Sequence, residues 1–483
     1  MVINLSKIGW LLTSCFIAMT FVPRSVDHIL FVDGLAYAAI ARNMALGQGS
    51  LWEPYFAESF WLSYNQLCAF FCEHPPLMFG MESLLFRILG DTTATENIYN
   101  LIVLLASIYL IAAIWKQLFR DNAEIRRQAW LPVLMWYGLK VVWWSVPNNL
   151  LDTTMAVFCL ASCLFQLKAF YAQRAYGYWL MAGVMIFLAC MTKGPVGLFP
   201  LALPILYGLA FDLKLAKPAI SGLVLMTVSF GLLLGAVLLY PPSNFFLTNY
   251  FHGQVVLALT KKREKVGDGL SSHLYLITLL FKNIIPHLLF LAGLILTCFF
   301  TRVEIGLKRH TQKVIGFSLL MIVCVILPMS VSVKQGDYYL MPALPFVGIF
   351  FAACGVEWLS RLSSRFSGIP RLVIPGLATV CIVVMVYQLK HQVEDEMYVK
   401  THKISEYVPP NSRIFLSPEI SAYSEIHTPF QRYARLSIAY DAKETDYLFF
   451  LNGEDPILDS IVAAKTHRSI DLGDDAHLLI RNR

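Results

Sequence analysis

The sequence has 483 residues, of which 57% are hydrophobic and only 14% are charged, and its formal net charge is +6. Soluble domains are about 45–50% apolar and about 25% charged, so this composition excludes an ordinary soluble protein and predicts an integral membrane protein. Charge-free apolar stretches near the roughly 20 residues that span a bilayer recur along the chain. We expect about eleven transmembrane helices, at 8–21, 97–115, 130–146, 153–167, 175–192, 195–211, 219–240, 283–301, 314–333, 338–356 and 372–389.

The charges between these stretches predict the topology. The first stretch follows Lys7, but no small-residue cleavage site comes after it, so we expect a retained helix rather than a signal peptide. With a cytoplasmic N-terminus and one crossing per stretch, the basic residues of the short loops fall on the cytoplasmic side, as the positive-inside rule requires. The exception is a basic run at 261–265 on the outside, which is either a solvated loop or a lid over an anionic substrate.

A long outside loop is expected between the first two spans, at about 24–96. Within it, residues 34–46 and 60–71 are predicted to form amphipathic helices that lie along the membrane surface. Residues 77–89 are apolar but short and carry two charges. Counting this segment as a span would move the later basic loops outside, so we place it in the interface.

After the last span the sequence becomes charged and polar. Short apolar runs at 413–416, 447–451 and 477–480 alternate with polar segments, a pattern typical of a small α/β domain. The predicted fold is therefore an all-α polytopic membrane domain, residues 1–389, followed by an α/β domain outside the membrane, residues 390–483.

Two carboxylates stand out at the outer ends of the predicted spans. Asp33 begins the first outside helix in FVDGLAYAAIARNM, and Asp152 begins a span in PNNLLDTTM. Either residue is explained as a helix N-cap, because Asp accepts hydrogen bonds from free backbone N–H groups. Alternatively, two carboxylates at one membrane depth form a pair for acid/base chemistry or for orienting an acceptor.

A second cluster surrounds the sequence EHPPL. Two consecutive prolines stop a helix and hold Glu73 and His74 in a defined turn. This is either a solvated interfacial turn or, with His252 of NYFHGQVV as a distant partner, a weak site for a zinc-like divalent metal. Cys68 and Cys72 lie one helical turn apart and either pair or stay free, with nothing that favours a metal there.

Cationic and aromatic residues mark two further helix ends. Lys193 precedes Gly194 and Pro195 between two apolar stretches, where the broken backbone allows the ammonium to enter a cavity and contact a phosphate. The alternative is a lysine that extends to the membrane surface. The segment KQGDYY, residues 334–339, carries tyrosines that suit either an interface belt or a site.

Together these motifs resemble a known family over roughly residues 8–355. The chain resembles bacterial GT-C glycosyltransferases of the aminoarabinose transferase and protein mannosyltransferase-like branch. Each segment is weak alone, but six occur in the family's order on a similar topology. The six are DGLAYAAIARNM, EHPPLMFGMESLLFRILG, LLDTTM, FLACMTKGPVGL, NYFHGQVV and KQGDYYLMPALP.

The resemblance implies roles for individual positions. Asp33 matches the catalytic aspartate of the first outside loop, and Asp152 matches a second acidic position that supports the acceptor or the catalytic site. Glu73 and His252 match positions that hold a divalent metal in the aminoarabinose branch.

The donor phosphate has its own matching positions. Lys193 matches a lysine near that phosphate and Tyr339 the tyrosine of a late K…Y…LP motif, while His74 and Arg87 are expected to add charge stabilisation. Two departures are visible. Gly34 follows Asp33 where the family commonly has Glu, and His74 stands where it commonly has Lys.

The predicted function is inverting sugar transfer from a polyprenyl-phosphate donor to a glycolipid of the lipid A type, a polysaccharide or a protein. We expect this at the periplasmic face of a bacterial inner membrane, with membrane lipids around the spans and no nucleic acid as partner. Two alternatives stay open, a transporter or flippase of lipid-linked substrate and an inactive scaffold of the same fold. A transporter commonly shows repeated halves and midplane charges, which this sequence lacks.

Overall fold

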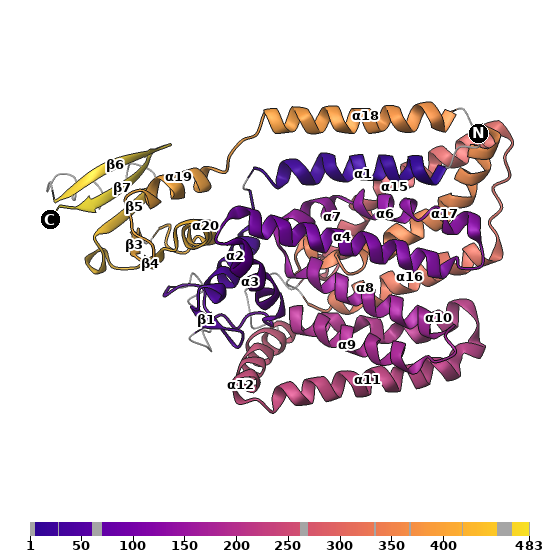
Figure 1. The fold of residues 1–483 in the computed structure, drawn as a ribbon, viewed down its shortest axis with the longest axis horizontal. Helices are drawn as coiled ribbons and strands as arrows, with labels where there is room; N and C mark the ends of the chain where they lie inside the picture. Colours follow the sequence, from indigo (N-terminus) through magenta and orange to yellow (C-terminus); the bar gives the residue numbers. More distant parts are fainter. Residues whose placement is uncertain are drawn as a thin grey trace. The chain divides into compact units, whose positions relative to one another are not determined.

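The computed structural model describes residues 5–27, 29–59, 70–260, 269–332, 335–366, 369–417, 419–451 and 466–482 (Figure 1). The chain divides into two compact units. Unit 1 contains residues 1–23, 73–78 and 98–391, and unit 2 contains residues 24–72, 79–97 and 392–483. The predicted domain division at residue 389 stays a prediction. In the structure the first outside loop groups largely with the C-terminal segment, whereas the sequence placed it with the spans.

Long apolar helices confirm the polytopic fold class. Within the described residues, nine helices are long and apolar enough to cross a membrane. In unit 1, α9 packs against both α8 and α11 (Figure 1), and α17 packs against α16 and α15. The nine are α1 (Leu5–Arg24), α4 (Thr93–Leu118), α8 (Leu151–Ala169), α9 (Tyr176–Lys193), α11 (Ala216–Leu238), α15 (Tyr275–Thr301), α16 (Arg309–Met329), α17 (Leu344–Arg365) and α18 (Ile369–Lys390).

The other two predicted spans, 130–146 and 195–211, are interrupted helices. The first becomes α6 (Trp130–Tyr137), α7 (Lys140–Ser145) and η1 (Val146–Asn148), and the second becomes η2 (Pro195–Ala202) and α10 (Leu203–Phe211). Prolines within the second account for its 3₁₀ start, because proline lacks the N–H that continues an α-helix. Shorter elements of unit 1 are α5 (Ala123–Arg126), η3 (Leu213–Leu215), α12 (Pro241–Tyr250), η4 (Phe251–Val256), α13 (Leu257–Leu259), α14 (Leu270–His273) and η5 (Asp337–Leu340).

Side chains of α15 bind backbone groups on both sides of the break between α6 and α7. A polar backbone group without a partner is costly inside a bilayer. The His287 Nε2 atom lies 2.7 Å from the Met135 carbonyl oxygen near the end of α6. The Asn283 Oδ1 atom accepts a hydrogen bond from the backbone N–H of Val141 at 3.2 Å, in the first turn of α7. The two polar residues of α15 therefore satisfy backbone groups on both sides of the break.

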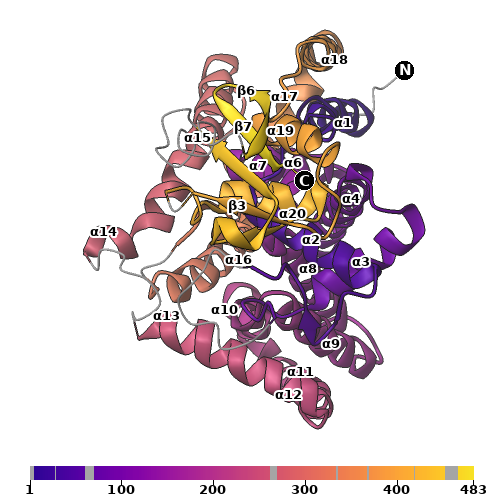
Figure 2. The ribbon, with the colours of Figure 1, turned by 90° about the vertical axis from the view of Figure 1, so that its left-hand side faces the viewer.

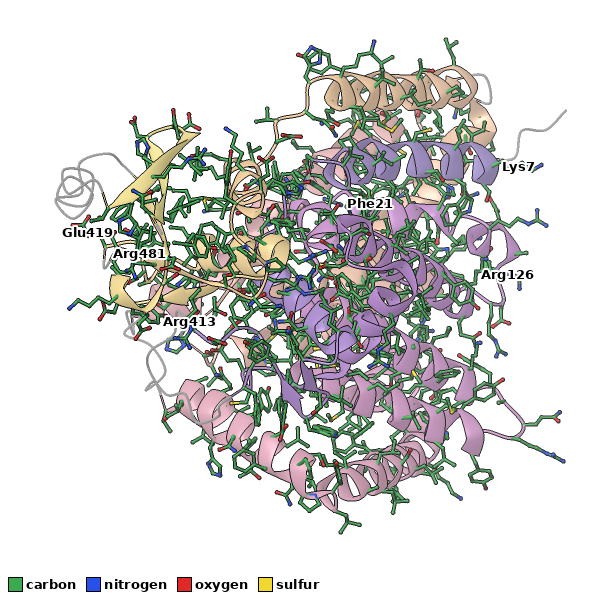
Figure 3. The ribbon with its side chains drawn as sticks, turned by 60° about the vertical axis from the view of Figure 1, so that its left-hand side comes forward. Lys7, Phe21, Arg126, Arg413, Glu419 and Arg481 are labelled. Atoms are coloured by element: carbon green, nitrogen blue, oxygen red, sulfur yellow. The ribbon has the colours of Figure 1, made fainter. Side chains whose placement is uncertain are left out.

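Basic residues lie together at one end of unit 1. Figure 3 shows Lys7 and Arg126 projecting from the same end of the helices. The Ser6 hydroxyl, beside Lys7, donates a hydrogen bond to the Arg127 carbonyl oxygen at 2.7 Å. The positive charges at the start of α1 and around Arg126, which the sequence assigned to one side of the membrane, thus lie at the same end of the helices.

The N-terminal part of unit 2 contains α2 (Val32–Ala45), the short antiparallel pair β1 (Gly49–Ser50) and β2 (Glu53–Pro54), and α3 (Leu77–Leu89). The predicted helix at 34–46 is present, but its expected amphipathic character was wrong. Residues 34–44 are all buried, so protein surrounds α2 on every side. Of the predicted helix 60–71, residues 60–69 lie outside the described residues, as does Cys68, while Cys72 is disulfide-bonded.

The C-terminal part of unit 2 is the predicted α/β domain. Its five-stranded sheet has the order β4-β3-β5-β7-β6, with β3 parallel to both β4 and β5 and the remaining pairs antiparallel. All three predicted strands are present. Figure 2 shows the helices of this segment beside its strands, and Ile414, Phe430 and Phe449 belong to one buried hydrophobic cluster. The elements are α19 (Glu396–Ser405), β3 (Arg413–Leu416), α20 (Ser424–Ala434), β4 (Ser437–Ala439), η6 (Ala442–Glu444), β5 (Tyr447–Leu451), β6 (His467–Gly473) and β7 (Ala476–Arg481).

Candidate active site

A buried ion pair lies at the centre of the candidate site in unit 1. Lys193 is the last residue of α9, and its Nζ donates to Oδ2 of Asp152, which stands in the first turn of α8. Lys193 is 9% exposed and Asp152 is 2% exposed. A charge this far from water requires a partner of opposite sign, and each residue supplies that partner to the other. The N-cap position of α8 is Leu150, so the capping interpretation of Asp152 was wrong.

The backbone after Lys193 turns sharply at Gly194. Its φ is 92°, a conformation that favours glycine. A Cβ atom at this position would stand 1.9 Å from the Tyr250 hydroxyl oxygen. That hydroxyl donates a hydrogen bond to the Lys193 carbonyl oxygen at 3.1 Å. Gly194 therefore allows Tyr250 of α12 to hold the end of α9, which presents the Lys193 side chain.

Aromatic rings cover the ammonium group. The Lys193 Nζ atom is 4.2 Å from the ring centroid of Tyr339 and 5.0 Å from that of Tyr338. Tyr338 in turn stacks on Trp144 at a centroid distance of 6.5 Å. Cation–π contacts of this kind are strongest where water is excluded. The tyrosines of KQGDYY thus contact the predicted phosphate-binding lysine.

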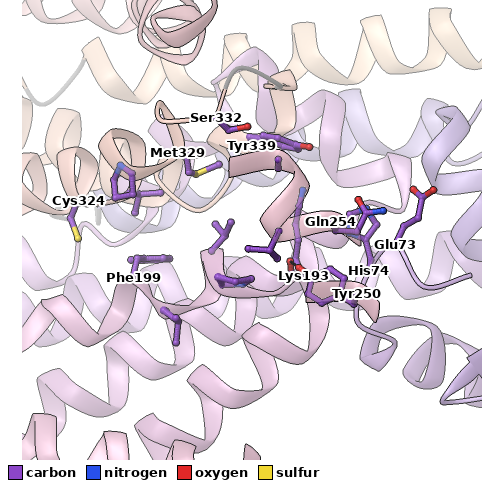
Figure 4. Close-up of a pocket in the computed structure, with 17 residues that line it drawn as sticks. Glu73, His74, Lys193, Phe199, Tyr250, Gln254, Cys324, Met329, Ser332 and Tyr339 are labelled. Carbon is purple, nitrogen blue, oxygen red and sulfur yellow. Dashed lines mark hydrogen bonds between the residues drawn. The ribbon is translucent and has the colours of Figure 1, made fainter. Parts of the chain in front are cut away.

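Lys193 lines a cavity of about 490 Å³. Figure 4 shows Lys193, Tyr250, His74, Gln254 and Glu73 gathered toward one end, with Phe199 and Cys324 at the other. Such a cavity suits an amphipathic molecule with a polar head and a hydrocarbon chain. Its lining residues are Glu73, His74, Lys193, Pro195, Val196, Leu198, Phe199, Tyr250, Gln254, Val255, Ala258, Cys324, Val325, Pro328, Met329, Ser332 and Tyr339.

Among the polar residues of this cavity that the sequence analysis missed are Tyr250 and Gln254. Both belong to the segment NYFHGQVV, in which only His252 was singled out. The segment includes η4, a π-helix, and such π-segments often occur at functional sites. The Gln254 Oε1 atom is buried without a hydrogen-bond partner among the described residues. A buried amide oxygen in a cavity wall is a group that a bound ligand can satisfy.

Other predicted site residues lie elsewhere. Asp33 stands in the first turn of α2, where Phe31 is the N-cap residue, so the capping interpretation was wrong for Asp33 as well. Arg87 is exposed in the last turn of α3. Both belong to unit 2 and neither lines the cavity. The basic run at 261–265 lies outside the described residues.

The predicted metal site is not assembled by the residues in view. Glu73 lines the cavity, whereas His252 is exposed in η4 and does not line it. Among the residues that the structure describes, no group of three or more His, Cys, Asp or Glu side chains could hold a metal ion. Metal dependence stays a prediction, and we assign no chemical step to a metal.

Sequence comparisons connect this geometry with known proteins. The family model of dolichyl-phosphate-mannose-protein mannosyltransferase matches residues 73–240, a range that includes Glu73, His74, Asp152 and Lys193. The undecaprenyl phosphate-alpha-4-amino-4-deoxy-L-arabinose arabinosyl transferase 2 of Proteus mirabilis is 22% identical over 390 residues. That match covers 79% of this chain and 66% of the relative, just under two thirds of its length.

Comparisons with solved structures identify the fold. ArnT from Cupriavidus metallidurans bound to undecaprenyl phosphate superposes with a TM-score of 0.65 and 15% identity, covering 98% of both chains. The Archaeoglobus fulgidus oligosaccharyltransferase, in complex with Zn and sulfate, gives a TM-score of 0.55 and 11% identity, covering 92% of this chain and 67% of that one.

The helical spans define a multi-span membrane protein, and its fold is similar to those of ArnT and the archaeal oligosaccharyltransferase. The family match and the bacterial relative confirm the resemblance predicted from the sequence, to glycosyltransferases of the aminoarabinose transferase and mannosyltransferase type.

Proposed function

We propose that this protein is an inverting glycosyltransferase that moves a sugar from a polyprenyl-phosphate donor to an acceptor at the periplasmic face of a bacterial inner membrane. The amphipathic cavity that contains Lys193 carries the proposal. Its polar end suits a sugar phosphate, and its apolar end, with Phe199 and Cys324, suits the first isoprene units of the lipid.

The polar end supplies three kinds of contact for the donor. The Lys193 ammonium, at the cavity wall, places a positive charge where the phosphate needs one. His74 adds an imidazole N–H at the cavity wall that can donate a hydrogen bond to the phosphate. Gln254 offers an amide oxygen that accepts a hydrogen bond from a sugar hydroxyl or ammonium. Exposed Arg87 is no longer part of the proposal.

The reaction is a single displacement. The acceptor oxygen attacks the anomeric carbon while the bond between that carbon and the phosphate oxygen breaks. The bonding electrons stay on polyprenyl phosphate, whose developing charge Lys193 stabilises. The acceptor proton passes to the carboxylate of Asp33, acting as general base. Attack opposite the leaving group inverts the anomeric configuration.

Asp152 receives a different role from the one predicted. Its Oδ2 atom binds Lys193, so we assign it as a positioning residue that compensates the lysine charge and directs the ammonium. An unpaired lysine in this buried place would be unfavourable as a cation. The acceptor-supporting role that the resemblance implies for Asp152 is therefore replaced by an action through Lys193.

Partners and orientation complete the proposal. The Proteus mirabilis relative is named as an arabinosyl transferase that uses an undecaprenyl phosphate-linked aminosugar, and this supports a donor of that class. A lipid A-type glycolipid, a polysaccharide and a protein are the acceptors to test. We place the N-terminus in the cytoplasm and residues 392–483 in the periplasm. The comparisons give the transporter alternative no support.

The test is transfer by the purified protein in native lipids, supplied with a panel of polyprenyl-phosphate sugars. Release of polyprenyl phosphate is measured for wild type, Asp33→Asn and Glu53→Gln. Asp33→Asn should lower kcat about 10²–10⁴-fold, the usual contribution of a general base. Glu53→Gln, an equal change at an exposed carboxylate of the same loop, should retain full activity. Wild type that turns over no donor, or an Asp33→Asn variant as active as wild type, would refute the assignment.

A further inference from the structure

The helix that carries Asp33 is held at its other end by the C-terminal domain, within unit 2. α2 packs on α20, and Arg42 in the last turn of α2 is 1% exposed. Its Nη2 atom donates to the carbonyl oxygen and to Oε1 of Gln431, at 2.8 and 2.9 Å. Its Nη1 atom donates to the carbonyl oxygen of Arg432 at 3.1 Å. These carbonyls belong to the last turn of α20, where the helix dipole favours a cation. The Gln431 carbonyl oxygen also accepts a hydrogen bond from the backbone N–H of Arg435 at 3.2 Å.

Further contacts fix the direction of α2. The Arg42 Nε atom donates to Asn43 Oδ1 at 2.9 Å. The Asn43 amide nitrogen donates to the carbonyl oxygens of Tyr55 and Phe56, at 3.1 and 2.8 Å. The end of α2 is therefore fastened both to α20 and to the chain that follows β2.

Arg432 is itself held in place by two carboxylates. Its Nε and Nη2 atoms form a two-point ion pair with Glu96, at 3.2 and 2.9 Å. Its Nη1 atom binds Asp91 Oδ1 at 2.8 Å, and Asp91 Oδ2 lies 3.4 Å from Arg42 Nη1. Asp91 thus joins the two arginines, and Glu96 fixes the second of them to the start of α4.

The network is largely buried, with Asp91 as its most exposed member among the four at 27%. Arg432 is 2% exposed and Glu96 is 1% exposed. Burial lowers the pKa of Arg42 to about 10, so this side chain stays charged at neutral pH. Burial also opposes the charge of Arg432, but the carboxylates of Glu96 and Asp91 outweigh it and raise its pKa. Arg435 Nε also lies 3.7 Å from Asp91 Oδ2, so three arginines share the two carboxylates.

Because α2 is a continuous helix, fixing its last turn also fixes the position of Asp33 in its first turn. Asp33 and Arg42 stand nine residues apart on α2, roughly 13 Å along a rigid rod at 1.5 Å per residue. The segment DGLAYAAIARNM contains both of them, yet the proposed reaction uses its first residue alone.

We propose that Gln431 and Arg432 of the C-terminal domain are positioning residues for Asp33, acting through Arg42 and the α2 helix. The inference rests on the proposed function, because it treats Asp33 as the group that meets the acceptor. A carboxylate displaced by about 1 Å can cost about a hundredfold in rate.

The test uses conservative variants of the full-length enzyme. Arg42→Lys keeps the charge but removes the fork that reaches two carbonyls of α20, and Gln431→Met removes the side-chain acceptor at similar volume. Both should lower kcat tenfold or more, with the donor KM within twofold of wild type. The amount of folded enzyme is determined from the number of undecaprenyl phosphate binding sites, and kcat is calculated per binding site. Arg413→Lys is the matched control, because Arg413 Nε pairs with Glu58 Oε2 at 2.6 Å between the same two segments, both side chains exposed.

A double-mutant cycle decides whether Arg42 acts through Asp33. In an Asp33→Asn background, Arg42→Lys should leave the residual rate unchanged, because the carboxylate that it positions is already gone. An equal fold-loss in both backgrounds, or full kcat per binding site in Arg42→Lys, would overturn the inference. If Asp33→Asn alone is as active as wild type, the proposed function fails first, and the inference falls with it.

Discussion

Buried charged residues have different roles in the two units. In unit 2, Arg42 and Arg432 direct their guanidinium groups at carboxylates and helix carbonyls of other chain segments. In unit 1, Lys193 binds one carboxylate and lies at the wall of a cavity. A network of ion pairs between chain segments fixes the positions of those segments, whereas a buried charge beside a cavity can act on a ligand. We therefore expect changes in the first cluster to alter stability more, and changes in the second to alter activity more.

The largest expected effect is on the stability of unit 2. Arg432→Met leaves Glu96 buried with an uncompensated charge, which should cost about 3–5 kcal/mol. The double variant Arg432→Met/Glu96→Gln should recover most of that loss, and thermal unfolding in detergent measures both. Equal stability of the single and double variants would show that the ion pair is not what the fold depends on.

Next comes the charge at the cavity. Lys193→Met should reduce transfer about a hundredfold, about 2.7 kcal/mol of transition-state stabilisation, measured as kcat/KM for the donor. The double variant Lys193→Met/Asp152→Asn removes both charges and should restore stability without restoring activity. Recovery of activity in the double variant would contradict a direct role for Lys193 at the phosphate.

Gly194 provides the backbone turn beside the cavity. Gly194→Ala combines a strained φ with a collision against Tyr250, so we expect a loss of about 1–3 kcal/mol. Thermal unfolding gives the stability and undecaprenyl phosphate binding gives the state of the site. Adding Tyr250→Phe removes the nearest atom and should return part of the loss. If adding Tyr250→Phe does not change the stability of the Gly194→Ala variant, backbone strain is the sole cause of the loss.

Gln254 should affect binding with little effect on stability. Gln254→Leu removes a buried oxygen that lacks a protein partner, so stability should hold or rise slightly. If the oxygen binds the sugar, the donor KM should rise about tenfold while the binding of sugar-free undecaprenyl phosphate stays the same. Equal weakening of both ligands would place Gln254 at the lipid phosphate instead.

The smallest expected effect is at the exposed pair of unit 2. Replacing Arg413 by Gln breaks its contact with Glu58, but exposed ion pairs contribute little. Neither the unfolding temperature nor kcat should change measurably. A clear loss of either would mean that the two segments of unit 2 are held together at this edge as well as by the arginine network.

The sequence by itself predicted the local elements well. Strands at 413–416 and 447–451 agree with β3 and β5, and the segment 77–89 agrees with α3. Runs of apolar residues determine these elements through their length and their flanking residues, which are local properties. The break at Gly138 carried no comparable signal, because its polar groups are satisfied by His287 and Asn283 about 150 residues further along the chain.

The candidate site was predicted residue by residue but not as an arrangement. Lys193, Asp152 and Tyr339 each drew attention as a polar group at the end of an apolar helix. Their contact follows from the packing of α8 on α9 and from the turn at Gly194. Gln254 was not predicted, because a glutamine in a sequence does not by itself indicate a site. Only the structure shows that its side-chain oxygen is buried.

What the sequence alone determined is the class of molecule: a chain of apolar spans with a polar C-terminal domain and a set of charged residues at helix ends. What only the tertiary structure decided is which charges meet. Arg42 and Gln431 are 389 residues apart, and no local pattern joins them. Hydropathy acts over one helix at a time, whereas a buried ion pair exists only where packing excludes water from two distant segments together.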